Sequence, residues 1–268
     1  MKKLEIYCVT NKLVPNLEKT SYNLACVGKD IFPDNYIKSD LGDNIFFKEK
    51  YYSELTFHYW FWKNLLPKID KSTWIGFCQR RRFWIKESSI KDSINKDNLL
   101  DNLLYYPEID WINYESIITK PISLTKIKIS KIFKRGLRSL VKSPSILFSE
   151  KKRNIKLHFD MHHGYGNLFK AINLLDNNDK DDFLKYVRSN TKFNPNIMFI
   201  AKKKIIQNWF NSLFPWLERC EKVFGFDNLK GYDTTRLYAF LAERYLSFWF
   251  KKYSKFEEKK WILLDFKD

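Results

Sequence analysis

The stretch Trp74-Ile75-Gly76-Phe77-Cys78-Gln79-Arg80-Arg81-Arg82-Phe83 decides the fold of this chain. Its first five residues are apolar and β-prone, which predicts a short buried strand. Three arginines, Arg80, Arg81 and Arg82, follow where this strand ends. Ligands of open α/β sheets bind beyond the carboxyl ends of the strands, and guanidinium groups bind phosphate through paired hydrogen bonds. The stretch therefore predicts a site for a phosphate-bearing ligand at the end of a central strand.

The residues before this strand predict an aromatic-rich helix that Pro67 ends, with Asn64 near its last turn. Four residues have helical spacing and fall on one side of it: Leu55, Tyr59, Trp62 and Leu66. Glu54 lies at the start, where a carboxylate complements the positive end of the helix dipole. That position explains Glu54 as well as a substrate role does, and both interpretations stay open.

Toward the N-terminus, the apolar run Leu4 to Val9 predicts the first strand of the sheet, and Leu24 to Val27 predicts a second. Thr10, Asn11 and Lys12 follow the first strand. Nucleotides are often held at such a switch from strand to loop, although an ordinary polar turn explains the same residues. Asp43 and Asn44 follow Gly42 in a loop, where both residue types also cap the next segment.

The C-terminal half predicts further regular structure. A strand is expected over Ile197 to Ala201, and a weaker one over Leu103 to Pro107. An amphipathic helix is expected over Lys204 to Glu221, with a kink or break at Pro215. The last long helix, Thr235 to Tyr253, carries Glu243 and Arg244.

Positive charge is concentrated in one region, because Glu150 is the only acidic residue from Ser116 to Leu157. Within it, apolar residues recur at helical spacing: Ile129, Ile132, Phe133, Leu137, Leu140 and Val141. The other faces carry Lys128, Lys131, Lys134, Arg135, Arg138 and Lys142. The pattern predicts a basic amphipathic helix within a basic insertion over residues 120–156, ended by Ser143-Pro144. The helix either packs on the core with a solvated basic face or lies on an anionic membrane surface.

Two clusters further along the chain offer metal-type side chains. His158, His162 and His163 lie close together in an expected loop, without the spacing of a zinc site. The sequence Asp179-Lys180-Asp181 is formally an Asp-x-Asp motif, but it falls in a polar linker where helix capping explains it better. No metal site is therefore expected, and a divalent cation is not favoured as a cofactor.

Composition limits the class of protein. A chain of 268 residues with 44% hydrophobic residues can bury a full core, either as one large α/β domain or as two lobes. The four cysteines are widely spaced, so a reducing cytoplasm is expected. We expect no signal peptide and no membrane-crossing segment, because no run is sufficiently long and uncharged. The formal charge of +17 suggests an anionic partner.

Several motifs together resemble one bacterial family, the capsular polysaccharide synthesis family (DUF4422). The resemblance lies in Gly42-Asp43-Asn44-Ile45, Tyr52-Ser53-Glu54-Leu55-Thr56, Tyr59-Trp60-Phe61-Trp62-Lys63-Asn64 and Ile75 to Phe83. It extends to Ile6-Tyr7-Cys8-Val9-Thr10-Asn11-Lys12, to Asn196-Ile197-Met198-Phe199-Ile200, and to Arg236, Glu243 and Arg244. It covers most of the chain except about residues 85 to 155. The family usually has His-Tyr where this chain has Gln79-Arg80, and often His in place of Asn11, so the roles of those histidines are not carried over.

The resemblance implies a GT-A-like α/β fold over 1–268, a Rossmann-type mixed sheet flanked by helices, and the transfer of a sugar from a nucleotide-diphosphate donor. The acceptor would be a glycan or a lipid-linked glycan in surface polysaccharide synthesis, and the enzyme would lie in the cytoplasm, either free or on the inner face of the cytoplasmic membrane. Arg81 and Arg82, helped by Arg80, are then expected to bind the diphosphate. The expected donor contacts are Thr10, Asn11, Lys12, Asp43 and Asn44. Other substrate contacts are expected from Tyr59, Lys63, Asn64, Arg236 and Arg244, and the candidates for the base are Glu54, Glu243 and His163.

Two other functions would also be compatible with this composition. A nucleic-acid-binding protein would explain the charge and the rings, but the aromatic residues gather in the Tyr59–Trp62 and Trp209–Trp216 segments instead of alternating with basic residues. No nucleic acid partner is therefore expected. A non-catalytic assembly partner of a polysaccharide complex is the other alternative.

Overall fold

The computed structural model describes residues 3–14, 16–126 and 129–264. The chain folds into two compact units. Unit 1 consists of Met1–Lys120, Asn196–Asn211 and Trp249–Asp268, and unit 2 consists of Pro121–Pro195 and Ser212–Phe248. That residues 1–268 act as a single domain stays a prediction.

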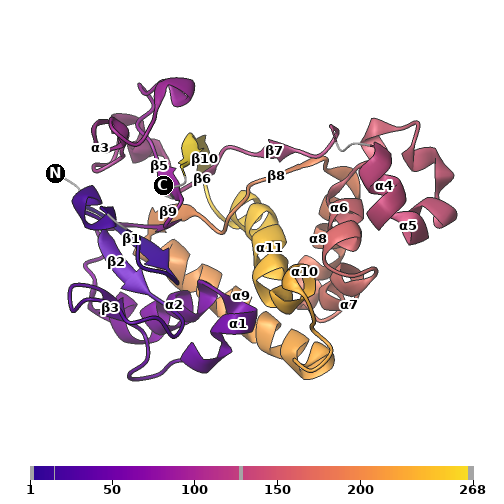
Figure 1. Cartoon of the computed structure of the whole chain (residues 1–268), viewed down its shortest axis with the longest axis horizontal. Coiled ribbons are helices and arrows are strands. Elements are labelled where there is room, and N and C mark those ends of the chain that lie inside the picture. Colours follow the sequence, from indigo (N-terminus) through magenta and orange to yellow (C-terminus); the bar gives the residue numbers. More distant parts are fainter. Residues whose placement is uncertain (1–2, 15, 127–128, 265–268) are drawn as a thin grey trace. The chain divides into compact units, whose positions relative to one another are not determined.

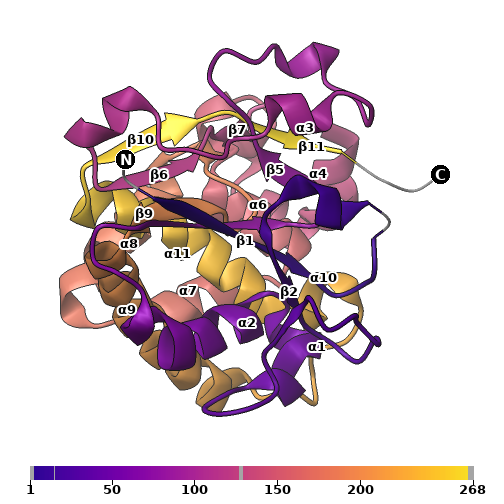
Figure 2. The same cartoon turned by 90° about the vertical axis from the view of Figure 1, so that its left-hand side faces the viewer.

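Unit 1 is built on a mixed sheet, which has nine strands within the described residues (Figure 2). The strands are β1 (Leu4–Thr10), β2 (Asn23–Cys26), β3 (Ile37–Lys38), β4 (Trp74–Gln79), β5 (Arg82–Trp84), β6 (Ser116–Thr119), β9 (Phe199–Lys202), β10 (Phe256–Lys259) and β11 (Trp261–Leu263). The main order is β10-β6-β9-β4-β1-β2-β3, and β5 pairs with both β4 and β11. Strand β1 is parallel to β2 and β4, whereas β9 is antiparallel to β4 and β6. The mixed α/β class and the predicted strands at the positions of β1, β2, β4 and β9 are thus confirmed.

The helices of unit 1 are short. They are η1 (Leu17–Thr20), η2 (Phe46–Lys48), α1 (Glu49–Tyr52), α2 (Leu55–Trp60), η3 (Phe61–Leu65), η4 (Leu66–Lys68), η5 (Lys91–Ser93), α3 (Leu99–Asn102) and η6 (Ile109–Asn113). The aromatic helix predicted before Pro67 is confirmed, but it changes from α-helix to a π-helical turn at Phe61 and to a 3-10 turn at Leu66. Such π-helical turns are often found at functional sites.

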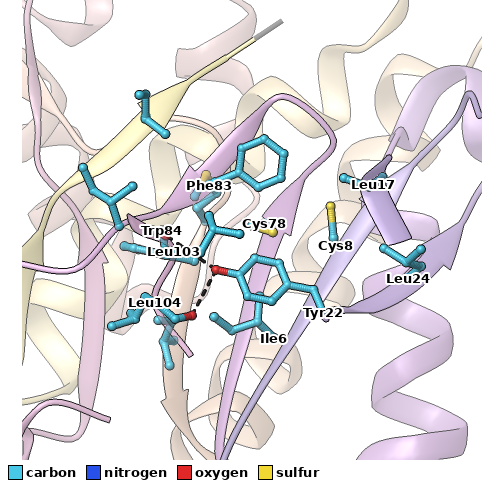
Figure 3. Packing of buried hydrophobic residues seen from close by; sticks show 14 of the residues in the cluster. Ile6, Cys8, Leu17, Tyr22, Leu24, Cys78, Phe83, Trp84, Leu103 and Leu104 are labelled. Carbon is cyan, nitrogen blue, oxygen red and sulfur yellow. Dashed lines mark hydrogen bonds between the residues drawn. The ribbon is translucent and has the colours of Figure 1, made fainter. Parts of the chain in front are cut away.

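Both faces of the sheet are covered by buried side chains. On one side, Cys8, Cys78, Leu17 and Leu24 surround the ring of Tyr22, whose hydroxyl donates a hydrogen bond of 3.0 Å to the carbonyl of Leu104 (Figure 3). The other side is aromatic and is formed by Tyr7, Phe57, Phe61, Phe77, Phe199 and Phe210. Because both faces are covered, the central strands are continuous apolar runs, which is why the sequence pattern located them.

One histidine lies inside the aromatic side of this core. His58 is 1% exposed, and its ring lies 4.4 Å from that of Phe77. Within the described residues its Nδ1 has no hydrogen-bonding partner. Burial lowers the pKa of His58 to about 3, because no charged partner compensates for the lost solvation.

We predict that His58→Phe makes the protein less sensitive to acid. The pKa of His58 in the folded state lies below its unfolded value of about 6.5. The contribution of His58 to the free energy of unfolding is therefore complete above pH 6.5, and it is progressively lost as the pH falls toward 3. At pH 5 the loss is about 2 kcal/mol. Urea unfolding should therefore show that the free energy of unfolding decreases less between pH 7 and pH 5 in the variant than in the wild type. An identical decrease in both proteins would contradict this assignment.

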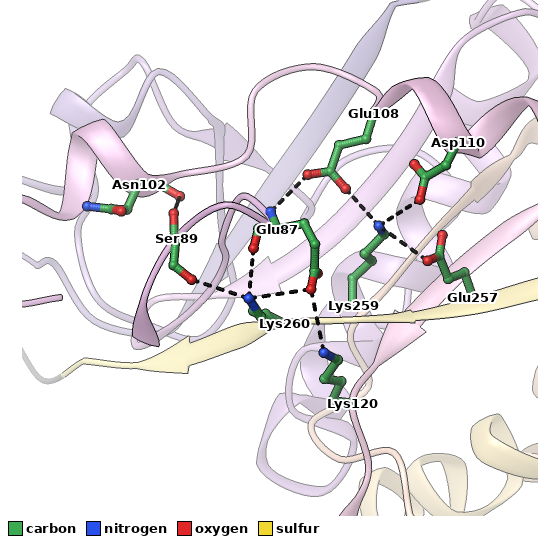
Figure 4. Close-up of polar contacts among 9 residues, drawn as sticks. All are labelled: Glu87, Ser89, Asn102, Glu108, Asp110, Lys120, Glu257, Lys259 and Lys260. Carbon is green, nitrogen blue, oxygen red and sulfur yellow. Dashed lines mark hydrogen bonds and ion pairs between the residues drawn. The ribbon is translucent and has the colours of Figure 1, made fainter. Parts of the chain in front are cut away.

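A buried charge, the ammonium of Lys259, holds the edge strand β10 in place. The ammonium of Lys259 lies 2.9 Å from Glu108, 2.9 Å from Asp110 and 3.3 Å from Glu257, and its side chain is only 5% exposed (Figure 4). Burial alone would lower the pKa of Lys259, but the hydrogen bonds to Glu108 and Asp110 outweigh it and raise the pKa. Lys259 therefore links β10 to the η6 segment.

We predict that Lys259→Met destabilises the protein by about 3–5 kcal/mol, because three carboxylates lose their common cation in a buried setting. Lys222→Met is the control. Lys222 pairs with Glu218 on a helix surface with 72% of its side chain exposed, so its loss should cost less than about 1 kcal/mol. Equal midpoints for the two variants in thermal unfolding would mean that the Lys259 cluster contributes no more than a surface pair.

Unit 2 is mainly helical (Figure 1). It contains β7 (Ile122–Ser123), α4 (Ile129–Arg135), α5 (Leu137–Lys142), η7 (Pro144–Ile146), η8 (Glu150–Lys152), α6 (Ile155–His162), α7 (Asn167–Ile172), α8 (Asn177–Ser189), β8 (Lys192–Phe193) and α10 (Tyr232–Thr235). The long helices α9 (Lys203–Phe224) and α11 (Leu237–Tyr253) have residues in both units. No described helix is long and apolar enough to cross a membrane.

The structure corrects the prediction of one basic helix. The helix is divided into α4 and α5 at Gly136, which is buried. A Cβ at this position would lie 2.9 Å from the carbonyl of Ile132 and 3.1 Å from Met161, so the close approach of α6 explains the glycine. Lys128, one of the predicted basic residues, lies outside the described residues.

Three further predictions of local structure were wrong, and a fourth was wrong in part. Leu103 to Pro107 makes only an isolated bridge from Leu103 to Ile85, because the carbonyl of Leu104 accepts from Tyr22 instead of from a strand. His158 and His162, which were expected in a loop, lie in α6, and His163 directly follows it. This helix begins before them because the side chain of Asn154 caps its N-terminus. The Asp-x-Asp sequence lies inside α8, where buried Asp179 accepts from Tyr245 at 2.5 Å. Helix α9 does not break at Pro215, because buried residues on either side hold both halves: Leu213, Trp216 and Leu217. A kink at Pro215 stays a prediction.

Candidate functional site

The candidate site of unit 1 lies where the direction of strand addition reverses. From β1 the chain adds β2 and β3 on one side, and it then returns to add β4 on the other side. The pairing of β1 with β4 runs from Leu4 opposite Trp74 to Val9 opposite Gln79. The carboxyl ends of these two parallel strands therefore meet at one edge of the sheet, which is the position where open α/β sheets bind ligands.

The end of β1 forms a tight polar turn. The hydroxyl of buried Thr10 donates to the carbonyl of Lys12 at 2.5 Å and accepts from the amide of Lys12 at 3.2 Å. Asn11 is half-buried and Lys12 is exposed. The ordinary turn that the sequence allowed is therefore present, and the nucleotide contact of these three residues stays a prediction.

The end of β4 carries the three arginines on a hairpin. Gln79 pairs with Arg82 across β4 and β5, so Arg80 and Arg81 form the two-residue turn between them. The carbonyl of Arg81 accepts a hydrogen bond of 2.8 Å from the amide of Leu264. All three side chains are half-buried. The structure thus brings the predicted diphosphate ligands together on one short element.

Gln79 connects this hairpin to two other segments, and sequence analysis missed it. Its Nε2 donates to the carboxylate of Glu54 and, at 2.8 Å, to the carbonyl of Asn196. Its Oε1 accepts from Arg82 at 2.8 Å. The only signal in the sequence was that Gln79 occupies a position where the family it resembles usually has histidine.

Strained backbone occurs on both segments that Gln79 contacts. Ser53, next to Glu54, has φ 53° and ψ −132°, while Asn196 and Ile197 have φ 78° and 51°. Non-glycine residues in such conformations cost on the order of 1–3 kcal/mol each and gather at functional sites. The strain therefore supports assigning the functional site to the neighbourhood of Gln79.

The predicted donor loop is attached to the far end of the aromatic helix. Asn64 accepts from the amide of Asp43 at 3.2 Å and donates to its carbonyl at 2.8 Å, while the hydroxyl of Tyr59 donates to the Asp43 carboxylate at 3.1 Å. Gly42 has φ +76°, and a Cβ there would collide with the amide group of Asn64. These residues are brought together, and their contacts hold the loop on the helix.

Two neighbours of that loop have local structural roles. Asn44 donates to the carbonyl of Gly42 at 2.9 Å and accepts from the amide of Phe46 at 3.1 Å, which is a local Asx turn that leads into η2. The ammonium of Lys63 lies 3.8 Å from the ring centre of Trp62 and 5.5 Å from that of Tyr59. Substrate contacts of Asn44 and Lys63 stay predictions.

Unit 2 contains the remaining candidates, beginning with a buried ion pair. Arg244 is 1% exposed, and its guanidinium pairs with the carboxylate of the adjacent Glu243. It also donates to Nδ1 of His158 at 3.2 Å and lies 3.8 Å from the ring centre of Phe193. Burial lowers the pKa of Arg244, and Glu243 acts in the opposite direction. Burial and the charge of Arg244 lower the pKa of His158 to about 2, so this ring accepts as neutral imidazole.

His163 is also held as a neutral ring. Its Nδ1 donates to the carbonyl of Asp233 at 2.8 Å, and its ring stacks on Phe240 with centroids 3.8 Å apart. Burial, together with the charge of Arg244, lowers the pKa of His163 to about 3. Because a carbonyl can only accept, the proton is on Nδ1 and the lone pair is on Nε2. A ring with so low a pKa is a weak base at neutral pH.

The other polar groups of unit 2 do not extend this cluster into a metal site. Arg236 ends α10 and lies 5.1 Å from the ring centre of Tyr232. Arg135 donates to His162 at 2.8 Å and to Asp233 at 3.0 Å. Among the described residues, no group of three or more histidine, cysteine or acidic side chains is placed to hold a metal ion.

We predict that Gln79→Glu destabilises the protein more than Gln79→Leu. Both variants lose the amide contacts, but glutamate also places a second carboxylate against Glu54, which costs on the order of 2 kcal/mol at pH 7. Protonation of one carboxylate should reduce the difference between the variants at pH 5. Urea unfolding at the two pH values measures the difference in free energy of unfolding between the two variants. A difference that does not change with pH would contradict the predicted contact between residues 79 and 54.

The chain is similar to one protein family and to one solved structure along most of its length. The family model "Domain of unknown function (DUF4422)" matches residues 5–255. No curated protein matches the chain. The apo structure of the bifunctional glycosyltransferase WbbM is similar with a TM-score of 0.70 and 19% identity, over 98% of this chain and 45% of that one. This chain thus spans less than half of that structure's length, and the similarity confirms the GT-A-like fold class.

Two fungal structures match much more weakly. Core-mannan synthase A from Aspergillus fumigatus, in its Mn/GDP form, has a TM-score of 0.32 and 12% identity, over 93% of this chain and 70% of that one. The mannosyltransferase Ktr4p from S. cerevisiae has a TM-score of 0.28 and 11% identity, over 91% of this chain and 63% of that one. Neither supports a conclusion about the site.

Proposed function

The chain belongs to the DUF4422 family, and from that premise we propose that it transfers a sugar from a nucleoside-diphosphate donor to a glycan acceptor in surface polysaccharide synthesis. The observation that carries the proposal is the arginine hairpin at the shared carboxyl edge of β1 and β4. That edge is where a nucleotide is held in folds of this class. The bifunctional glycosyltransferase of similar fold supports the same reaction class.

The arginines supply the charge that the reaction needs. When the bond from sugar to phosphate breaks, negative charge grows on the leaving diphosphate, and fixed cations stabilise it. Arg82 is oriented by Gln79, and Arg80 and Arg81 are fixed on a two-residue turn. Because these cations are already ordered, they can neutralise the diphosphate without a divalent ion. We therefore propose a metal-independent transfer.

The donor's nucleotide and sugar lie along the same edge in this proposal. Lys12 is exposed directly beyond β1, and the turn made by Thr10 sets its direction. Asp43 and Asn44 line another side of the proposed donor site, on a loop that Asn64 and Tyr59 fix in place. Tyr59 and Asn64 then act mainly as positioning residues, and Lys63 adds a cation beside them.

Glu54 is the base that we favour for the acceptor hydroxyl. Its carboxylate accepts from Gln79 and so has a fixed direction next to the arginine hairpin. Glu243 instead pairs with buried Arg244, and the pKa of His163 of about 3 makes that ring a poor proton acceptor. In this assignment Glu243 and Arg244 serve the structure of unit 2, where they pair with each other.

The acceptor is proposed to be lipid-linked, so that the enzyme acts in the cytoplasm against the inner face of the membrane. The support is the charge of the basic region, in which residues 126–149 include no acidic residue. Anionic lipid attracts such a segment.

We predict that Arg81→Ala and Arg82→Ala each lower the transfer rate about a hundredfold, or about 3 kcal/mol in the transition state, while EDTA leaves the rate of the wild type unchanged. The assay is release of nucleoside diphosphate from a panel of UDP- and GDP-sugars with a glycan acceptor. Arg219→Ala is the control for loss of an arginine, because Arg219 pairs with Asp176 in unit 2. Thermal unfolding checks that each variant remains folded.

Opposite results would identify the alternatives. Strict dependence on manganese or magnesium with normal rates in both arginine variants would overturn the metal-free mechanism. Nucleoside-diphosphate binding without hydrolysis or transfer would favour a non-catalytic assembly partner. Tight binding of random-sequence RNA, with no thermal shift by any nucleotide sugar, would favour a nucleic-acid-binding protein.

A further inference from the structure

The surface formed by α4 and α5 exposes a line of apolar side chains. Phe133, Leu137 and Val141 follow one another at intervals of four residues, and they are 51%, 59% and 74% exposed. Ile132 and Leu140, from the same sequence pattern, are buried in unit 2 at 0% and 8% exposure. The apolar residues thus serve two purposes. One set packs the helices onto the unit, and the other set, the apolar stripe, faces solvent.

Basic side chains flank the apolar stripe. Lys131, Lys134, Arg138 and Lys142 are all exposed on α4 and α5. Phe148, a few residues further on, is 89% exposed. Exposed apolar residues flanked by basic residues are typical of helices that lie in the interface of an anionic bilayer. A solvated surface helix would not need the stripe.

A cationic cavity opens beside the stripe, within unit 2. Its volume is about 450 Å³, and α5, η8, α6 and α8 contribute Lys142, Lys152, Lys156 and Arg188 to its lining. Lys142 belongs to both the stripe's basic flank and the cavity. Figure 1 shows α4 and α5 beside α6. A group held in the cavity therefore lies close to Val141.

The charge of the cavity is strongly one-sided. Among the described residues, Asp160 is the only acidic one that lines it, against four cations. Its carboxylate is 1% exposed and is occupied by Lys156 at 2.5 Å and by the amide of Gly166 at 3.1 Å. Asp160 therefore fixes Lys156 in position. The ring of Tyr165 lies 5.3 Å from the ammonium of Lys142 and 5.5 Å from that of Lys156, which keeps both lysines at the cavity.

We propose that this cavity binds the phosphate of a lipid head group while the apolar stripe lies in the same membrane. Phosphate oxygens match a cluster of lysine and arginine donors better than any neutral head group does. A soluble phosphate would explain the cavity but would leave Phe133, Leu137 and Val141 without a role. The cavity is lined by residues of unit 2, whereas the arginine hairpin belongs to unit 1, so the cavity adds a second phosphate site to the molecule.

The test is flotation of the full chain with three kinds of vesicle at low salt. One is phosphatidylcholine alone, and the other two contain phosphatidylglycerol or phosphatidic acid at matched surface potential. Phosphatidic acid offers an exposed phosphomonoester that can enter the cavity, whereas phosphatidylglycerol offers equivalent surface charge with a blocked phosphate. We expect about tenfold tighter binding to phosphatidic acid than to phosphatidylglycerol, and no binding to phosphatidylcholine alone.

Two double variants with equal loss of charge separate the cavity from general attraction. Lys152→Gln with Arg188→Gln should abolish the preference for phosphatidic acid. Lys134 and Arg138 do not belong to the cavity lining. Lys134→Gln with Arg138→Gln should therefore weaken binding to both anionic vesicles by the same factor, about tenfold or more. Circular dichroism verifies that both variants keep their helices. Equal preference in the wild type, or the same response from both variants, would overturn the proposal.

Pyrophosphate distinguishes a soluble ligand from a lipid. Micromolar binding of pyrophosphate that is lost in Lys152→Gln with Arg188→Gln, together with no flotation on any vesicle, would overturn the lipid assignment. Since flotation measures binding without sugar transfer, failure here leaves the proposed glycosyl transfer standing, and an inactive enzyme that still floats leaves this inference standing.

Discussion

The parallel pairing of β1 with β4 is the interaction on which the rest of unit 1 depends. It extends from Leu4 and Trp74 to Val9 and Gln79. Parallel strands need a crossover between them and cover on both faces, so this single pairing requires the aromatic layer on one side and the cluster around Tyr22 on the other. It also places both carboxyl ends at one edge. The polar turn after β1 and the arginine hairpin after β4 are neighbours because the register allows no other arrangement.

The fold could be predicted where local sequence and tertiary environment agree. Strands β1 and β4 are apolar because both of their faces are buried, whereas helix α9 shows its period because only one of its faces is buried. Strand β10 was missed because Phe256 to Lys259 carries three charges, and its pairing depends on Lys259 meeting carboxylates far away in the sequence. The opposite error occurred at Leu103 to Pro107. Leu103 and Leu104 are apolar because they fill a core, although they do not extend the sheet.

The site could be predicted only in part, for a related reason. Charged groups in a short cluster, such as the arginines, are visible in one window of sequence. The contacts of Gln79 are not, because its partners Glu54 and Asn196 are 25 and 117 residues away. An amide is also a less conspicuous residue type than a cation. Likewise, the unusual φ values of Ser53 and Ile197 have no counterpart in composition, since glycine or asparagine is expected at such positions. Tertiary contacts impose these conformations, and only the folded chain reveals them.

The close approach of Gly42 and Asn64 has a consequence for how this family can diverge. The amide of Asn64 occupies the space that any larger side chain at position 42 would need, and it holds the backbone of Asp43 through two hydrogen bonds. A change at Gly42 therefore has to displace Asn64 and release the loop, whereas a change at Asn64 removes the reason for glycine. Positions 42 and 64, which are 22 residues apart in the chain, are thus expected to change together. Relatives should retain both residues or replace both, and intermediates with only one of them should be rare.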